Sequence, residues 1–375
     1  CPEEVPTVRE YLLVMLVAGV VTFWLTPLVR WFAVRAGAIT PVRGRDVHAV
    51  PKPRLGGLAM LAGLFGATLV ASRLPYLSQI FADTQMYGVL AAAVVVSALG
   101  AADDRWDLHW ALKLGGQVAA AVVMAAQGVS LISLPIQGYT ILPGPVSLAL
   151  TILLVVATMN AVNFVDGLDG LAAGMVGIAA AAFFVWSYEL SHTYDPPNVF
   201  STATFITAVL MGVTAGFLPH NFHPSRLFMG DAGSLLLGLL MAAATISLTG
   251  TVDPAAVGVA SRTAAVVLPL ALPVAVVAIP LVDMLLAVVR RTRAGRKPWD
   301  ADARHLHHQL LRLGHSHRSA VLTMYLWAAT LAGGVLSFNY LPEWAGLVLL
   351  VSLGVLAALV TWVVPRRVAP EGDPS

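Results

Sequence analysis

Residues 228–250 read FMGDAGSLLLGLLMAAATISLTG, and this stretch sets the class of fold. A short polar motif with one carboxylate, Asp231, runs directly into an uninterrupted apolar segment over 233–250. A helix that spans a bilayer needs about 20 mostly apolar residues. The stretch therefore predicts a transmembrane helix with Asp231 as its N-terminal cap, at the membrane surface.

Similar apolar segments recur along the whole chain. Together they lie at about 11–30, 56–74, 86–102, 114–127, 145–162, 170–188, 199–218, 233–250, 264–289, 319–338 and 344–364. A membrane β-barrel would show alternating segments of about ten residues, and these segments are continuous. We therefore expect one all-α domain over residues 1–375, a polytopic membrane protein with about eleven transmembrane helices.

The composition agrees with a membrane protein. The 375 residues are 58% hydrophobic and 11% charged, against roughly a quarter charged in an ordinary soluble domain. A soluble enzyme, a disordered protein and a nucleic-acid binder are poor fits to these values. The formal net charge of +2 gives no general reason to expect acidic partners.

The Lys and Arg residues predict the orientation in the membrane, because cytoplasmic loops carry an excess of them. With the N-terminus outside and the C-terminus in the cytoplasm, 19 of the 22 fall on inner loops or the helix ends beside them. Nine of the ten histidines fall there too, and only His192 lies on an outer loop. Chemistry is therefore expected at the cytoplasmic face.

Five inner loops carry the polar motifs. They lie near residues 35–57, 103–113, 160–170, 219–234 and 290–318. Each precedes a helix whose N-terminus would point at the cytosol, a geometry that favours anions such as phosphates. Because the loops share one face of the membrane, we expect them to converge on one site.

Carboxylates beside apolar spans are expensive and usually functional. They are Asp103, Asp104, Asp166, Asp169 and Asp231. Mg²⁺ prefers oxygen ligands and is typically held by one or two carboxylates together with substrate phosphates. A site for a diphosphate with Mg²⁺ explains the set more economically than scattered helix caps do. On a helix, Asp103 and Asp104 would aim in different directions, whereas Asp103 and Asp107 would share a face.

Two other groups leave alternatives open. Asn160, Asn163, Asp166 and Asp169 step by three residues, which fits either a polar stripe on a continuous helix or a turn cluster. The loop 290–318 carries His305, His307 and His308 without cysteine or an HExxH motif, so a phosphate-gripping loop is favoured over zinc. Attraction to anionic lipids is the alternative. Asp283, inside the ninth span, belongs either to the catalytic shell or to a helix pair.

The motifs resemble those of the polyprenyl-phosphate N-acetylhexosamine-1-phosphate transferases, from about Arg43 to Arg318. The matching patterns are DDxxD, NxxNFxDGLDGLAxG, NFHPxxxFMGDAGS and HLHHxLLxLGHSHR. The last resembles the bacterial N-acetylglucosamine branch, since the muramoyl-pentapeptide branch has three consecutive histidines there. The resemblance implies UDP-GlcNAc as donor, an undecaprenyl or decaprenyl phosphate as acceptor, and Mg²⁺, with Mn²⁺ as the alternative ion. The products would be polyprenyl-diphosphate-GlcNAc and UMP, which starts a cell-envelope glycan.

The same resemblance implies roles for single residues. Asp231 and Asn163 match the family's magnesium site, and Asp103 and Asp104 match its aspartate pair, which is expected to help hold the same ion. Lys113 matches a lysine near the phosphates. The positions that match the uridine site are Leu168, Asp169, Asn221 and Phe228. Asp103 is the candidate base, with positioning, metal binding and an aspartyl-phosphate route as alternatives. The remaining expected site residues are Asp166, His307 and His308 in catalysis, and Lys52, Arg304 and His305 in substrate binding.

The implied setting is the bacterial plasma membrane, with the active site on the cytoplasmic face and a homodimer as the family's expectation. No nucleic-acid partner is expected. Three alternatives remain: another UDP-N-acetylhexosamine as donor, an anion transporter, and a lipid-binding scaffold without activity. A transporter would place its charges near the midplane of the membrane, whereas most acids here sit at one surface.

Overall fold

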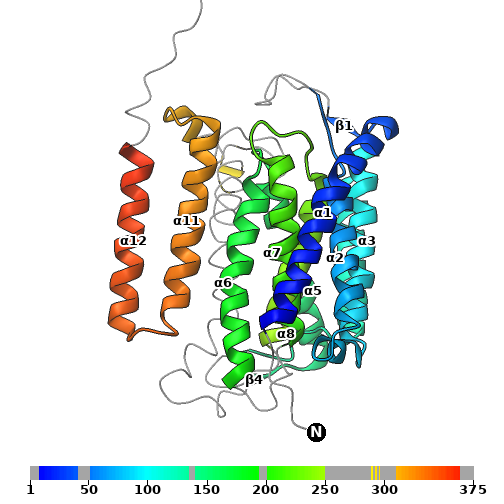
Figure 1. The fold of residues 1–375 in the computed structure, drawn as a ribbon, viewed down its shortest axis with the longest axis vertical. Helices are drawn as coiled ribbons and strands as arrows, with labels where there is room; N and C mark the ends of the chain where they lie inside the picture. Colours follow the sequence, from blue (N-terminus) through cyan, green and yellow to red (C-terminus); the bar gives the residue numbers. More distant parts are fainter. Residues whose placement is uncertain are drawn as a thin grey trace, which may run out of the picture.

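A computed structural model gives the fold, and it describes residues 8–40, 51–134, 140–193, 201–249 and 310–363, with 289, 292, 293 and 295. This part of the chain forms an all-α bundle (Figure 1). Its α-helices are Val8–Ala36 (α1), Gly56–Ala71 (α2), Gln85–Trp106 (α3), Trp110–Ala126 (α4), Gly144–Val165 (α5), Leu171–Thr193 (α6), Ser201–Asn221 (α7), Gly230–Thr249 (α8), His317–Ser337 (α11) and Glu343–Val363 (α12).

Short elements join some of these helices. A 3₁₀-helix, Leu77–Phe81 (η1), lies between α2 and α3. The strands Ile39–Thr40 (β1) and Lys52–Pro53 (β2) form an antiparallel pair in which Thr40 lies opposite Lys52. The strands Ser133–Leu134 (β3) and Thr140–Ile141 (β4) form a second antiparallel pair between α4 and α5.

Ten of the predicted apolar segments coincide with described helices, so the expectation of an all-α polytopic membrane protein is confirmed. Eight of these helices are long and apolar enough to cross a membrane, and α2 and α4 are shorter apolar helices. The ninth predicted span, 264–289, lies outside the described residues apart from Val289. The predicted total of eleven spans therefore stays a prediction.

Helix α8 forms the centre of the bundle. Ninety-four per cent of its apolar window is buried, and it packs against α2, α3, α5 and α7. A Cβ atom added at Gly57 would lie 2.1 Å from the backbone nitrogen of Gly233, and one at Gly238 would lie 2.5 Å from the Cα atom of Met159. Small residues let helix backbones approach closely where no aqueous hydrophobic effect drives association. The glycines therefore permit the burial of α8.

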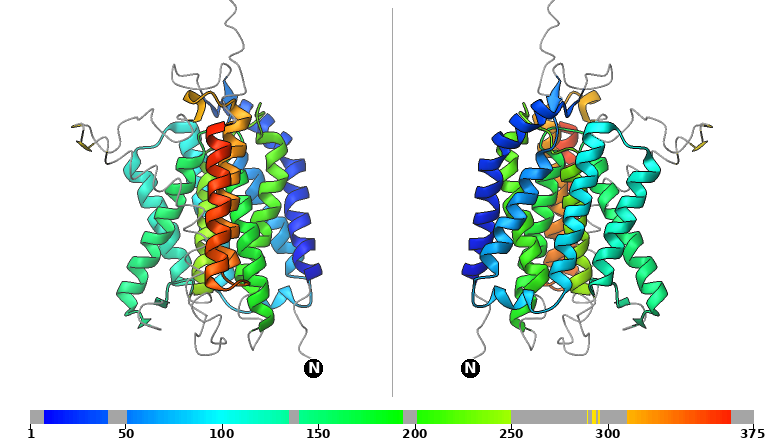
Figure 2. Two further views of the ribbon diagram at one scale, coloured as in Figure 1. Left: turned by 90° about the vertical axis from the view of Figure 1, so that its left-hand side faces the viewer. Right: turned by 90° about the vertical axis from the view of Figure 1, so that its right-hand side faces the viewer.

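The outer helices are arranged in pairs. Figure 2 shows α4 and α5 together at one flank of the bundle. At the edge seen on the left of Figure 1, α12 packs against α11, which in turn packs against α6. Only 11% of the apolar window of α12 is buried inside the structure, so its outer face is suited to contact with lipid.

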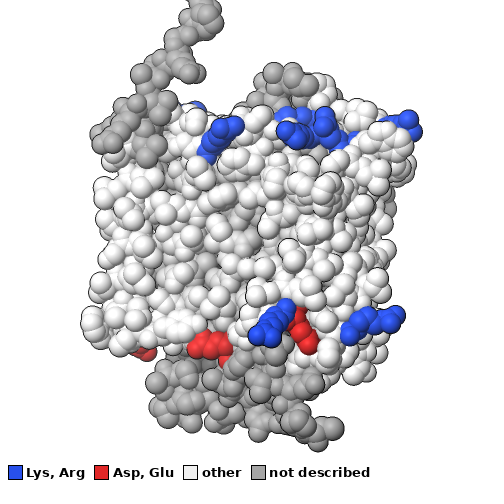
Figure 3. All heavy atoms as spheres, viewed as in Figure 1, with Lys and Arg blue, Asp and Glu red and all other residues white. Residues whose placement is uncertain are grey.

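The described cations gather at the end of the bundle where α8 begins, which we call the site end (Figures 1 and 3). At or beside this end lie Arg30, Arg35, Lys52, Arg54, Arg105, Lys113, Arg226, Arg312 and Arg318. At the opposite end lie Arg9, in the first turn of α1, and Arg73, two residues after the end of α2. This asymmetry is the one that the positive-inside rule associates with a cytoplasmic face.

We predict that Gly57→Ala lowers the stability of the protein. The new methyl group would meet backbone of α8, which cannot move aside as a flexible side chain can. Over-packing a tight interface costs about 1–3 kcal/mol, so we expect a lower unfolding temperature in detergent, followed by intrinsic fluorescence.

Gly115→Ala in α4 is the matched control. Among the described residues, no atom outside the helix lies within 4 Å of a Cβ added there. Alanine also favours helix more than glycine does. An unfolding temperature for Gly57→Ala at or above that of Gly115→Ala would contradict the close approach of α2 and α8.

Candidate active site

Segments far apart in sequence meet at the site end through backbone hydrogen bonds. The N–H of Phe228 donates to the carbonyl of Pro53 at 3.0 Å, and the N–H of Gly56 donates back to the carbonyl of Phe228 at 3.0 Å. The N–H of Gly57 then donates to the carbonyl of Met229. The segment before α2 is thereby fixed along the α7–α8 loop, which carries Lys52 into the site.

Asp103, Lys113, Asn163 and Asp231 form one group of contacts, which we call the Asp231 cluster. The Lys113 ammonium lies 3.1 Å from Asp103 Oδ2 and also pairs with Asp231 Oδ2. Asn163 Nδ2 donates to Asp231 Oδ1 at 2.9 Å. Four helices, α3, α4, α5 and α8, thus contribute one side chain each. The carboxylates of Asp103 and Asp231 therefore share one positive charge, the Lys113 ammonium.

The other aspartate of the pair has a different partner. Asp104 Oδ1 accepts the backbone N–H of Asp231 at 3.0 Å, and Oδ2 accepts that of Ala232 at 3.3 Å. The first N–H groups of a helix have no partner within it, and an anion there also interacts favourably with the helix dipole. Asp104 therefore caps α8 from α3, a role that the sequence suggested for Asp231 itself.

Gly230 makes this cap possible. It has a φ of +68°, and a Cβ atom there would lie 2.2 Å from Asp104 Oδ2. A side chain at this position would therefore be strained and would also displace the carboxylate. With Asp104 supplying the cap, the carboxylate of Asp231 is left to face Lys113 and Asn163.

The Asp231 cluster gathers carboxylate and amide groups around the Lys113 ammonium. The side chains of Asp103 and Asp231 are 12% and 18% exposed, so they are reachable while largely removed from solvent. Carboxylate and amide oxygens are ligands that Mg²⁺ accepts in proteins. The cluster therefore fits a divalent cation with Asp231, Asp103 and Asn163 as its donors.

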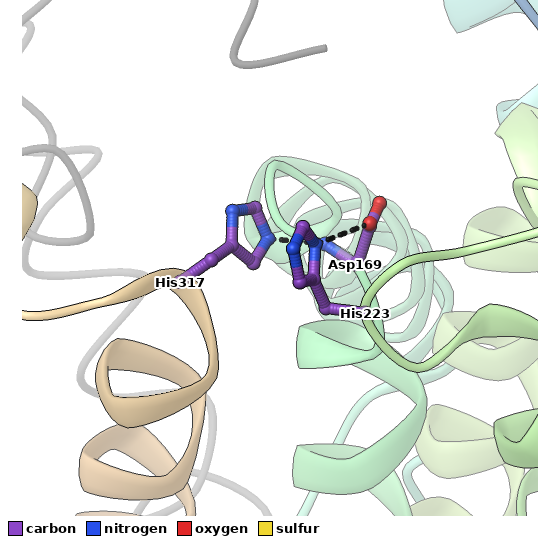
Figure 4. A group of neighbouring side chains, drawn as sticks. All are labelled: Asp169, His223 and His317. Atoms are coloured by element: carbon purple, nitrogen blue, oxygen red, sulfur yellow. Dashed lines mark hydrogen bonds and ion pairs between the residues drawn. The ribbon is translucent and has the colours of Figure 1, made fainter. Parts of the chain in front are cut away.

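Asp169 centres a second group, the Asp169 cluster, which also contains Lys52, His223, Ser225 and His317. Its carboxylate is fully buried and accepts from the Lys52 ammonium at 3.1 Å and from His223 Nδ1 at 2.9 Å. The Ser225 hydroxyl donates to Oδ1 at 2.7 Å, and the Ser225 N–H donates to Oδ2 at 3.0 Å. Figure 4 shows Asp169 with the two histidines. The buried charge is thus paired and hydrogen-bonded, as burial requires.

Asp169, His223 and His317 could hold a metal ion by distance alone, because their ligand atoms lie within 4.8 Å of one another. Oδ2 of Asp169, however, already accepts from Lys52, His223 and the Ser225 N–H. Oδ1 accepts the Ser225 hydroxyl, so both carboxylate oxygens of Asp169 already accept from donors within this cluster. We therefore interpret these residues as a hydrogen-bonded network.

Asp166 is the C-terminal cap of α5, and in the chain it lies between Asn163 of the Asp231 cluster and Asp169. Burial raises the pKa of its carboxyl from the ordinary value to about 7; the charge of Asp104 also raises the pKa, and Arg54 lowers it. Within the described part of the chain, its carboxylate makes no hydrogen bond. A carboxyl whose pKa is raised by burial beside other charged groups is a candidate functional group.

The residues expected around uridine lie on the Asp169 side. Asn221 is buried, and its side chain accepts the N–H of Gly170 at 3.0 Å and donates to the carbonyl of Leu227 at 3.0 Å. Asn221 thus joins the α5–α6 loop to the α7–α8 loop. Leu168 is buried, and the half-buried Phe228 ring has the Lys52 ammonium 5.2 Å from its centroid.

The structure decides between the two alternatives left open for Asn163 and Asp169, and it corrects one local expectation, that for Asp107. Asn163 and Asp169 do not share a helical stripe, because α5 ends at Val165 and the loop 166–170 turns the chain into α6. Asp107 does not extend the Asp103 face, because α3 ends at Trp106 and Asp107 has a φ of +51° with an exposed side chain. In both cases the helix ends before the later residue of the pair.

Described residues from all five expected loops meet at the site end, the fifth loop through His317 and Arg318. The expected residues Asp283, Arg304, His305, His307 and His308 lie outside the described residues. Sequence reasoning did not select His223, Ser225 and His317. All three lay within motifs already quoted, but nothing in the sequence linked them to Asp169.

Comparison with known proteins bears on what this arrangement does. Residues 86–249 match glycosyl transferase family 4. The chain is 44% identical to a decaprenyl-phosphate N-acetylglucosaminephosphotransferase of Mycolicibacterium smegmatis, over 97% of this chain and 91% of the relative. It is 31% identical to the undecaprenyl-phosphate alpha-N-acetylglucosaminyl 1-phosphate transferase of Escherichia coli, over 85% of this chain and 82% of the relative.

We predict that Asp104→Asn destabilises the protein more than Asp103→Asn does. An asparagine at 104 offers one acceptor for two backbone N–H groups, and its own NH₂ would face a donor. An unsatisfied buried donor costs about 1–3 kcal/mol. The measurement is thermal unfolding of both variants in the same detergent.

Asp103→Asn is the internal comparison. Its side chain is partly exposed and accepts from the N–H of Leu108 and from Lys113, so water can replace a lost partner. Equal losses of stability in the two variants would show that Asp104 does not act as the cap of α8.

Proposed function

This chain belongs to glycosyl transferase family 4, and we propose that it transfers N-acetylglucosamine-1-phosphate from UDP-GlcNAc to a polyprenyl phosphate. The products are polyprenyl-diphosphate-GlcNAc and UMP. The relatives carry this chemistry in their names, at 44% and 31% identity over most of the chain. The observation that supports it in the structure is the Asp231 cluster, set beside Lys52 and Phe228 at one end of an apolar bundle.

The reaction is a phosphoryl transfer between two anions. An oxygen of the lipid phosphate attacks the β-phosphorus of the nucleotide sugar; the bond from that phosphorus to the bridging oxygen breaks, and UMP leaves with the electron pair. Such chemistry consists mostly of positioning and charge neutralisation. A phosphate monoester has its second pKa near 6, so the acceptor is largely dianionic at neutral pH and a strong base is not required.

The Asp231 cluster supplies the charge for this step. Lys113 lies against Asp103 and Asp231, where its ammonium can also face the diphosphate. We assign Asp103 to orientation of Lys113 and of the attacking group, with a proton-accepting role as the alternative.

Mg²⁺ is the expected cofactor, with Mn²⁺ as the alternative. Asp231, Asp103 and Asn163 would hold it, and we leave Asp104 out of the ligand set because both of its oxygens accept N–H groups of α8. When bound, the ion neutralises charge on the diphosphate and on departing UMP.

The donor's nucleotide part would lie at the Asp169 cluster. The Phe228 ring offers an aromatic face for a base, and Lys52 is fixed beside it by Asp169 and Ser225. Leu168 and Asn221 shape the same wall. We propose that Asp166, which lies in the chain between Asn163 and Asp169, faces the junction of the two parts of the donor.

The bilayer accounts for this architecture. Each buried CH₂ of a prenyl chain stabilises the membrane-bound state by about 0.8 kcal/mol, so the acceptor stays in the membrane and the enzyme brings a soluble nucleotide to it. We assign the site end to the cytoplasmic face of the bacterial plasma membrane, because the cations gather there. A transporter is disfavoured, since the described site acids lie at this end and not at mid-membrane.

Turnover with parallel donors tests the function. Purified protein receives labelled UDP-GlcNAc or UDP-MurNAc-pentapeptide with decaprenyl phosphate, with and without Mg²⁺. We expect labelled lipid and UMP from UDP-GlcNAc alone, and only with the ion. Labelled lipid from the muramoyl donor alone would overturn the assignment of UDP-GlcNAc as the donor. Full turnover in the presence of a chelator would overturn the assignment of Mg²⁺ as the cofactor. Labelled lipid from neither donor would overturn the transferase proposal.

We predict that Asp231→Asn lowers kcat at least a hundredfold. The substitution removes the charge that would hold the metal ion and removes one of the two carboxylates paired with Lys113. Losing one such electrostatic group typically costs a factor of about 10²–10³ in kcat. UMP release is measured at saturating UDP-GlcNAc and decaprenyl phosphate.

Asp107→Asn is the matched control, because Asp107 is an exposed aspartate outside the Asp231 cluster, and asparagine tolerates its left-handed backbone. Its turnover should equal that of the wild type. Turnover of Asp231→Asn within threefold of this control would remove Asp231 from the site.

A further inference from the structure

Two side chains of α11 form hydrogen bonds with the backbone of adjacent residues in the α5–α6 loop. His317 Nε2 accepts the backbone N–H of Asp169 at 3.3 Å. Two turns further along α11, the Tyr325 hydroxyl donates to the carbonyl of Gly170. Gly170 itself has a φ of +82°, and its N–H donates to Asn221. The turn that presents Asp169 is therefore fixed from α11 as well as from α7.

The first turn of α11, which carries His317 and Arg318, also contacts the α7–α8 loop. The rings of His317 and His223 are stacked, with centroids 4.2 Å apart and an interplanar angle of 19°. Arg318 Nε donates to the carbonyl of His223 at 3.1 Å. His223 Nδ1 in turn lies 2.9 Å from Asp169 Oδ2. Asp169 is thus held at its backbone by His317 and at its carboxylate by His223.

Close packing of α11 on α6 supports these contacts. A Cβ atom added at Gly174 would lie 2.0 Å from the Tyr325 ring, so the ring fills the space that this glycine leaves. The Tyr325 hydroxyl consequently reaches the loop just before α6 begins. A side chain larger than hydrogen at 174 would displace the Tyr325 ring and its hydroxyl.

These contacts link α11, one contact after another, to the proposed nucleotide site. His317 and Tyr325 fix the 169–170 backbone, Asp169 holds the Lys52 ammonium at 3.1 Å, and Lys52 lies 5.2 Å from the Phe228 ring centroid. A shift of the loop would move Asp169, and with it Lys52. Neither α11 residue is part of the Asp231 cluster.

We propose that His317 and Tyr325 are positioning residues for the donor nucleotide. This inference rests on the proposed function, since it assigns the nucleotide of UDP-GlcNAc to the Asp169 side. The hydrogen bond requires an acceptor at His317 Nε2, which is met by the neutral ring protonated at Nδ1. Glutamine also offers an acceptor at this reach, whereas leucine does not.

The test compares His317→Gln, His317→Leu, Tyr325→Phe and the double variant His317→Leu with Tyr325→Phe. Kinetics give kcat and the KM values for UDP-GlcNAc and for decaprenyl phosphate. Losing one hydrogen bond that fixes the loop should raise KM for UDP-GlcNAc about tenfold in His317→Leu and Tyr325→Phe. His317→Gln should stay near the wild-type KM. The KM for decaprenyl phosphate and kcat should change less than threefold.

The double variant and a control separate positioning from general stability. Because both residues hold one loop, the double variant should raise KM by less than the product of the two single effects. Leu322→Ala, an exposed apolar residue on the same helix, should leave all three constants unchanged. The unfolding temperatures of all variants are measured in parallel.

An unchanged KM for UDP-GlcNAc in folded His317→Leu would overturn the inference. So would an equal fall of kcat in His317→Leu and His317→Gln together with lower unfolding temperatures, because that pattern marks a purely structural role. Calorimetric binding of UDP to the same variants keeps the two proposals separable. A wild-type protein that binds UDP without turnover would overturn the proposed function alone, and unaltered UDP binding by His317→Leu would overturn the inference alone.

Discussion

The capping of α8 by Asp104 is the interaction on which the site depends. It joins the end of α3 to the start of the buried central helix, where Gly100 lets the two backbones meet: a Cβ there would lie 2.3 Å from the Ala232 nitrogen. The first N–H groups of α8 receive an acceptor that an apolar bundle would otherwise lack. Because that cap comes from α3, the carboxylate of Asp231 is left to face Lys113 and Asn163.

A second constraint is the cost of burying charge among apolar helices, which is met by pairing. Asp103 and Asp231 share Lys113, while Asp169 takes Lys52, His223 and Ser225. The two clusters differ in what they hold together. One gathers carboxylate and amide groups around the Lys113 ammonium, and the other fixes the Lys52 ammonium beside the Phe228 ring. α11 joins this scheme through Asp169 and Gly170, so a helix near the end of the chain supports a site built mainly from α3 to α8.

The sequence by itself determined the class of fold and the set of polar loops. Apolar runs about as long as a bilayer is thick leave little choice but helices, which is why ten predicted segments coincide with described ones. Resemblance to known motifs marked Asp103, Asp169 and Asp231. Local spacing left open whether Asn163 and Asp169 share a helical stripe, and the structure places them in different clusters because α5 stops at Val165.

Only the tertiary structure decided how the paired aspartates divide their roles and which residues hold Asp169. Asp103 and Asp104 are neighbours of one type, and their difference arises because one faces Lys113 while the other faces the start of α8. His317 is 148 positions from Asp169, and its role depends on α11 packing against α6. Hydrogen bonds between distant segments follow from helix packing, whereas sequence periodicity reports only the faces of single helices.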